Sequence, residues 1–97
     1  MTVEQGSAVA MPWVNEVAGI VQCWYSGNEA GNAIADIIYG KVNPSGRLPL
    51  TLPKRIEDTP SYLNTKSEYG KIHYREDLHV GYKHYQATKL EPQFAFG

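Results

Sequence analysis

The longest apolar run of the chain covers residues 18–25. It reads Ala-Gly-Ile-Val-Gln-Cys-Trp-Tyr and is rich in β-branched and aromatic residues. Such a run is typical of a strand that is buried on both faces, as in a parallel sheet. Residues 1–5 have the pattern expected at the end of another strand. The sequence therefore predicts a strand over residues 18–25 and the end of an earlier strand at residues 1–5.

A helix is predicted directly after this strand. Its apolar residues recur at intervals that form one stripe along a helix, namely Ala30, Ala33, Ile34, Ile37 and Ile38. Asn28 can cap this helix, and Glu29 falls in its first turn, where the helix dipole favours a carboxylate. Gly40 stands where a left-handed residue would end the helix. Residues 18–40 thus predict a strand, a tight turn and a helix, which together are half of a βαβ unit.

The second half of the chain has weaker periodicity. Over residues 48–53 leucine alternates with proline and threonine, and the prolines restrict such a segment to the edge of a sheet. Residues 54–71 predict irregular chain. Two aromatic-rich stretches, residues 72–74 and 80–85, predict short extended segments.

These elements predict an α/β fold with one clear βα unit, followed by irregular, aromatic-rich extended segments. A strand buried on both faces needs neighbouring strands at its edges and helices on both faces. The chain offers only one convincing helix for that purpose. We therefore expect residues 1–97 to be a single partial domain, whose other strands lie upstream in a longer polypeptide.

Composition excludes several kinds of partner. The chain has 9 Lys and Arg against 10 Asp and Glu, for a net charge of −1. A nucleic acid or an anionic membrane surface would need a basic surplus, so we expect neither as a partner. No apolar run approaches the roughly 20 residues that span a bilayer. The first residues carry no signal-peptide pattern, and localisation is left open.

The side chains that could carry chemistry are few. Glu29 follows the predicted strand, and open α/β sheets bind ligands at the carboxyl ends of their strands, so Glu29 could belong to a ligand site. The simpler interpretation is that Glu29 stabilises the helix dipole. The single Cys23 and the scattered histidines do not form a metal site, so no metal is predicted. The turn over residues 26–31 lacks the glycines of a dinucleotide fingerprint and the ending of a P-loop, so no cofactor is predicted.

A long motif resembles a known family. Residues 24–36 read W-Y-S-G-N-E-A-G-N-A-I-A-D, and residues 37–49 continue as I-I-Y-G-K-V-N-P-S-G-R-L-P. These stretches resemble the W-Y-x-G-x-E-x-G-N-A-I-A-D and G-x-x-N-P-S-G-[RK]-L-P stretches of glycoside hydrolase family 3, specifically its β-glucosidases. Residues 6–13 are similar to the family's G-[ST]-P-V-x-M-P-W, with Ala8 where proline is usual. Residues 80–85 and 91–97 are similar to V-G-Y-R-Y-Y and E-P-L-F-P-F-G. The pattern looks most like that of yeast and filamentous-fungal members.

The resemblance implies a place within a larger enzyme. Family members carry a barrel-like domain, then an α/β/α sandwich domain, and often a fibronectin-type domain. The resemblance implies that this chain is an incomplete three-layer α/β/α sandwich, its C-terminal portion, without the barrel and fibronectin-type domains. The implied partners are a β-glucoside substrate, bound through the parent enzyme, and the missing sandwich strands and neighbouring domains.

The implied reaction is retaining hydrolysis of β-glucosides, which needs two carboxyl groups about 5–5.5 Å apart. The family's Ser-Asp-Trp nucleophile motif is absent, and Glu4 lies too close to Met1 to belong to the acid/base loop. No catalytic residue is therefore assigned, and the chain alone is expected to be inactive. Asn28 and Glu29 are the candidates for residues that face the cleft or support the acid/base loop.

A different class of function stays open. The chain could be a free-standing carbohydrate-binding or protein-interaction module, with the apolar strand, Phe94 and Phe96 as its interface. Its two tryptophans and seven tyrosines could stack on sugar rings, although aromatic residues are commoner in cores and domain interfaces. A short hydrolase that uses Glu29 with Glu76 or Asp77 would lack both the barrel and a cleft for the sugar.

Overall fold

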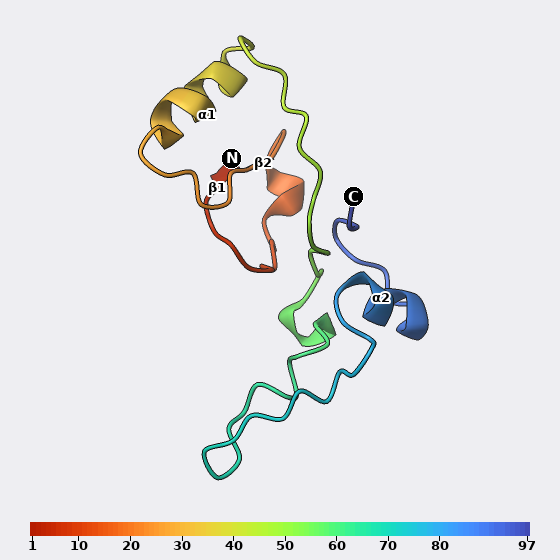
Figure 1. The fold of residues 1–97 in the computed structure, drawn as a ribbon. Coiled ribbons are helices and arrows are strands. Elements are labelled where there is room, and N and C mark those ends of the chain that lie inside the picture. Colours follow the sequence, from red (N-terminus) through yellow and green to blue (C-terminus); the bar gives the residue numbers. More distant parts are fainter. The chain divides into compact units, whose positions relative to one another are not determined.

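The structure is a computed structural model that describes residues 1–97. Its strands and α-helices are β1 (Thr2–Val3), β2 (Val21–Gln22), α1 (Ala30–Ile38) and α2 (Tyr82–Thr88), shown in Figure 1. Two 3-10 helices, η1 and η2, span Val14–Glu16 and Ile56–Asp58. The chain divides into two compact units. The first comprises Met1–Ser7 and Trp13–Gly46, and the second comprises Ala8–Pro12 and Arg47–Gly97.

The first unit contains a parallel pair of strands. Thr2 pairs with Val21, and Val3 pairs with Gln22. The pairing confirms a strand near the N-terminus, but the strand expected over residues 18–25 is only two residues long and is half-buried instead of buried on both faces. The reason is that β1 is its only partner within the chain. A hydrogen-bonded ladder extends only as far as a neighbouring strand runs beside it.

Helix α1 covers the predicted apolar stripe, but its start differs from the expectation. The N-cap residue is Glu29, not Asn28, and no side chain caps the helix. Glu29 was expected in the first turn of the helix, but it lies one residue before that turn. Its backbone angles (φ −92°, ψ 14°) lie outside the extended region in which a side chain folds back to cap a helix. The predicted cap at Asn28 is wrong.

The C-terminal end of α1 lies just before Gly40, as the sequence predicts. Gly40 has a φ of +75°, which L residues with a side chain adopt only under strain. The Gly40 N–H donates to the Ile37 carbonyl at 3.1 Å, and the Lys41 N–H donates to the Asp36 carbonyl at 2.8 Å. These are the two bonds of a Schellman motif, which satisfies the last carbonyls of a helix.

The second unit holds the only buried side chains of the chain, which are Met11, Thr51, Leu52, Pro53 and Tyr85. Leu52 forms an antiparallel bridge with Phe94, and the Leu52 N–H donates to the Phe94 carbonyl at 2.9 Å. The Gly97 N–H donates to the Leu48 carbonyl at 2.9 Å. Residues 48–53 therefore pair along one side, as expected of an edge segment.

The prediction that residues 80–85 are extended is wrong, because helix α2 begins at Tyr82. Gly81, with a φ of +55°, turns the chain into the helix. The helix includes lysine, glutamine and alanine, which favour helical structure. Tyr82 and Tyr85 lie three residues apart and so share one face, on which Tyr85 is buried.

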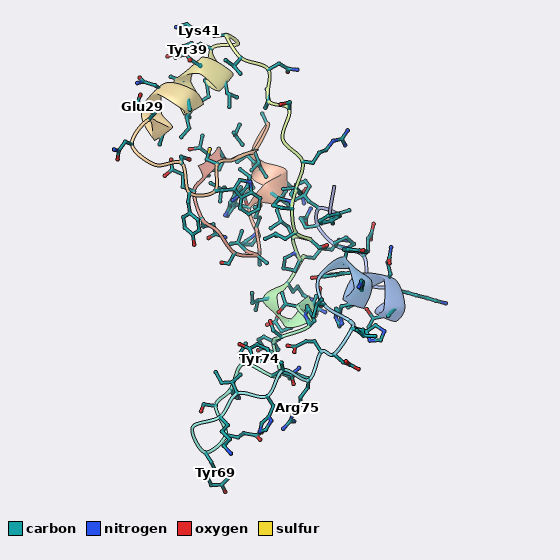
Figure 2. The ribbon with its side chains drawn as sticks, viewed as in Figure 1. Glu29, Tyr39, Lys41, Tyr69, Tyr74 and Arg75 are labelled. Carbon is teal, nitrogen blue, oxygen red and sulfur yellow. The ribbon has the colours of Figure 1, made fainter.

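Residues 61–80 leave the core of this unit and return to it, as Figure 1 shows. Glu68 and Lys71 exchange two backbone hydrogen bonds of 2.8 and 3.0 Å around Tyr69 and Gly70. Both central residues have positive φ, +52° and +76°, as in a type I′ hairpin turn. Figure 2 shows Tyr69 at the tip, with Tyr74 and Arg75 further back along the hairpin. The prediction of irregular chain over residues 54–71 holds except for this turn and η2.

Replacing Gly40 by alanine tests the end of α1. A methyl group at Gly40 would touch nothing, so its effect is the cost of the left-handed backbone alone. In the full-length protein we expect Gly40→Ala to lower the free energy of unfolding by about 1 kcal/mol, measured by urea titration with circular dichroism. The control is Gly31→Ala, also in open space but inside α1, which should cost nothing or stabilise the helix. Equal losses in both variants would contradict the assignment.

Candidate functional site

The carboxyl ends of β1 and β2 lie at the same edge of the sheet, because the two strands are parallel. The segments that follow them, residues 4–7 and 23–29, therefore meet there. The Gln22 side chain joins the two segments, since its Nε2 donates to the Gln5 carbonyl at 3.0 Å. The amide oxygen of Gln22, Oε1, is buried without a hydrogen-bond partner. This edge is where α/β sheets bind their ligands.

Tyr25 lies directly against Gly6 at this edge. A β-carbon at Gly6 would overlap the Tyr25 ring, so the ring rests on the bare backbone of the other segment. Tyr25 is nevertheless 86% exposed. The preceding residue, Trp24, has a φ of +55°, which is uncommon for a bulky side chain. The sequence analysis includes Trp24 and Tyr25 only within the set of aromatic residues that could stack on sugars, and it does not select Gly6, although all three belong to the matched motifs.

Asn28 and Glu29 lie at the end of the same segment, where α1 begins; Figure 2 shows Glu29 at this end of the helix. Both side chains are exposed. The Asn32 amide donates to Glu29 Oε2 at 2.6 Å and so orients this carboxylate along the first turn of the helix. Glu29 is the only carboxylate of residues 23–29. Glu4, directly after β1, is the other carboxylate of this edge, and neither Glu4 nor Glu29 belongs to the motifs that supply the catalytic pair of glycoside hydrolysis.

The remaining polar groups of this segment hold the turn. Ser26 Oγ donates to the Cys23 carbonyl at 2.9 Å. The Cys23 thiol is half-buried and lies 3.7 Å from the Val21 carbonyl, which leaves it as a small core side chain. Gly27, with a φ of +71°, allows the chain to turn towards the helix. These contacts fix the shape of the segment, and we assign them no catalytic role.

A concave feature lies in the second unit. It is a hollow of about 550 Å³ beside α2, lined by Thr51, Tyr82, Tyr85, Gln86, Lys89, Leu90, Glu91, Pro92, Ala95 and Phe96. The rings of Tyr82 and Phe96 stack at its side, with centroids 5.1 Å apart. The hydroxyl groups of Thr51 and Tyr85 are buried and have no hydrogen-bond partner. At the rim, Lys54 Nζ lies 2.7 Å from Glu91 Oε2, and this hydrogen-bonded ion pair lowers the pKa of Glu91.

No three histidine, cysteine or acidic side chains of the chain lie close enough together to hold a metal ion. Neither α-helix has the length and apolar character needed to cross a membrane.

Comparison with known proteins identifies the family. A profile of the glycosyl hydrolase family 3 C-terminal domain matches residues 1–82. The chain belongs to this family. It is 50% identical, over all 97 residues, to the probable β-glucosidase I of Emericella nidulans and to that of Aspergillus terreus. The family resemblance of the sequence motifs is thereby confirmed.

Solved structures agree with this family 3 assignment. The β-glucosidase from Kluyveromyces marxianus in complex with glucose matches 98% of the chain with a TM-score of 0.91 and 43% identity. The β-glucosidase 3B from Thermotoga neapolitana in complex with glucose also matches 98%, with a TM-score of 0.86 and 37% identity. The chain spans only 12% of the two fungal relatives and of the Kluyveromyces structure, and 14% of the Thermotoga structure. In coarse terms its fold is that of a small mixed α/β piece of the family 3 C-terminal domain.

The buried Tyr85 hydroxyl makes the stability of the second unit dependent on pH. Burial, and secondarily the charge of Asp58, raise the pKa of Tyr85. The neutral hydroxyl of Tyr85 therefore contributes its full stability to the folded state at pH values below the pKa of an unfolded tyrosine, about 10. This contribution is lost as the pH rises through the higher pKa that Tyr85 has in the folded protein. In the full-length protein we expect the free energy of unfolding to fall above pH 10, and to fall less in Tyr85→Phe, when both are measured by urea titration at several pH values. The control, Tyr39→Phe at an exposed position, should decline as the unmodified protein does. An identical decline in Tyr85→Phe would contradict the prediction.

Proposed function

We propose that residues 1–97 are part of a retaining β-glucosidase that removes terminal β-D-glucosyl residues from oligosaccharides or glucosides. The observation that carries this proposal is the 50% identity, over all 97 residues, to much longer probable β-glucosidases of fungi. The solved relatives in complex with glucose support the same substrate class. The β-glucoside would be bound by the complete enzyme, because this chain lacks the two catalytic carboxyl motifs.

We further propose that the chain is a single partial domain, the C-terminal portion of a three-layer α/β/α sandwich. Parallel sheets occur almost only where helices cover both faces, and β1 and β2 alone are too small to form such a sheet. No residue of α1 is buried within the chain, and Ile38 on its apolar stripe is 60% exposed. Both features are accounted for if further strands and helices of the parent enzyme pack against this unit.

Within that enzyme, we propose that Asn28 and Glu29 face the cleft and support the loop that carries the acid/base carboxyl. Both lie on the segment that follows β2, at the carboxyl edge of the parallel pair. The Asn32 amide leaves one side of the Glu29 carboxylate free to accept a hydrogen bond from a neighbouring loop. This role is positioning, since neither residue would touch the scissile bond.

The dependence on the parent enzyme can be tested with two proteins. The full-length protein should hydrolyse cellobiose and aryl β-glucosides, and the isolated 97-residue chain should have no measurable activity. The ¹⁵N–¹H amide spectrum of the isolated chain should contain collapsed or broadened peaks, because the apolar face of α1 and the edges of the sheet are uncovered. Sharp, well-dispersed peaks would instead indicate an autonomous module, and sugar titration into the same sample would test carbohydrate binding.

The role of Glu29 can be tested in the full-length protein. We expect Glu29→Ala to lower kcat/KM by about tenfold to a hundredfold through misplacement of the acid/base loop, with less change in KM than in kcat. Glu29→Gln keeps the shape and the hydrogen-bond acceptor, and should retain more activity. Asp36→Ala, a substitution on the same helix at an acidic residue paired only with Lys41, is the control. Unchanged kcat/KM and unchanged stability in Glu29→Ala would contradict the role.

A further inference from the structure

We propose that Tyr25 is a sugar-binding residue whose phenol ring stacks on a pyranose ring of the β-glucoside substrate. This inference rests on the proposed function and adds to it a specific contact with the substrate. It differs from the role given to Asn28 and Glu29, because Tyr25 would touch the sugar itself.

The first argument is the way in which the Tyr25 ring is held. The ring lies so close to Gly6 that no side chain could be present there. Gly6 follows β1 and Tyr25 follows β2, so the parallel pairing of these strands brings the two residues together. The Gln22–Gln5 hydrogen bond also links the two segments, one residue before Gly6. The ring therefore has a fixed support and loses little conformational freedom when a ligand stacks on it.

The second argument is the exposure of a supported aromatic ring. Tyr25 is 86% exposed, although a ring of this size normally gains from burial. Tyr39 is similarly exposed, at 82%, but it lies at the end of α1 with no contact of this kind (Figure 2). Within residues 1–97, Tyr25 thus combines a rigid attachment to Gly6 with a ring that no other part of this chain covers.

The third argument is the backbone that presents the ring. Trp24, directly before Tyr25, is in the left-handed region, with a φ of +55°. Bulky residues adopt this conformation rarely, and such residues are concentrated at ligand-binding and active sites. The strained residue lies at the carboxyl edge of the parallel strands, where α/β sheets bind their ligands.

The chemistry of the ligand fits this surface. The hydroxyl groups of a β-glucoside are equatorial, so each face of its pyranose ring presents C–H bonds. Such a face packs against an aromatic ring, and the tyrosine hydroxyl can form a hydrogen bond at the rim of the sugar. Glu29, four residues away on the same segment, is an exposed acceptor for the loop that holds the acid/base carboxyl.

The test uses the full-length protein and two substitutions that displace the same ring. Tyr25→Ala removes the ring, and Gly6→Ala pushes it away from its support. We expect both to raise the KM for cellobiose by about tenfold, with a smaller change in kcat, as for the loss of one aromatic stacking contact. Tyr25→Phe keeps the ring and should stay within about threefold of the unmodified enzyme. Tyr39→Ala, the equally exposed control, should leave KM unchanged.

The outcomes separate this inference from the proposed function. If the unmodified full-length protein has no β-glucosidase activity, the proposed function fails, and this inference fails with it. If that protein is active and Tyr25→Ala keeps its KM, only the stacking role is overturned. A lower melting temperature of Tyr25→Ala with an unchanged KM would assign the ring to packing against another part of the enzyme, which also overturns the role. A rise in KM for Tyr25→Ala and Gly6→Ala, with recovery in Tyr25→Phe, supports it.

Discussion

The parallel pairing of β1 with β2 decides where the candidate residues of the first unit lie. Each strand is only two residues long, yet the pairing brings the segments after both strands to one edge. The Gln22–Gln5 hydrogen bond and the contact of Tyr25 with Gly6 both follow from it. An antiparallel pairing would have placed residues 4–7 at the opposite end from residues 23–29. The orientation of the pair is therefore what creates a site at this edge.

The same pairing also makes the chain dependent on its surroundings. Parallel strands are stabilised in sheets that are covered on both faces, and one pair with one helix does not provide that cover. The buried side chains all belong to the second unit, while the apolar stripe of α1 has no buried member. Two hydroxyl groups in the second unit, those of Thr51 and Tyr85, lack the hydrogen bonds that buried polar groups normally make. These features fit a chain that spans 12% of the fungal enzymes it resembles.

The site was only partly accessible to sequence reasoning. Glu29 and Asn28 could be selected because they follow an apolar run and precede a helical stripe, which is a local pattern. The sequence pattern did not correctly predict which of the two residues is the N-cap, because that depends on the backbone angles at the turn. Tyr25 and Gly6 are nineteen positions apart (25 minus 6), and nothing in either local pattern predicts that one supports the other. That contact depends on a strand register, which a sequence of this composition does not specify by itself.

The sequence by itself determined the elements that depend on local chemistry. The stripe of α1, its end at Gly40 and the edge character of residues 48–53 follow from side-chain spacing, from the left-handed backbone that glycine allows and from the missing N–H of proline. It also determined the family, through motifs that extend along the whole chain. Only the tertiary structure decided how long β2 is, that residues 82–88 are helical and that Tyr25 lies on Gly6. The physical reason is that strand length, the burial of Tyr85 and a contact between two loops are set by partners distant in sequence, whereas caps and turns are set by neighbours.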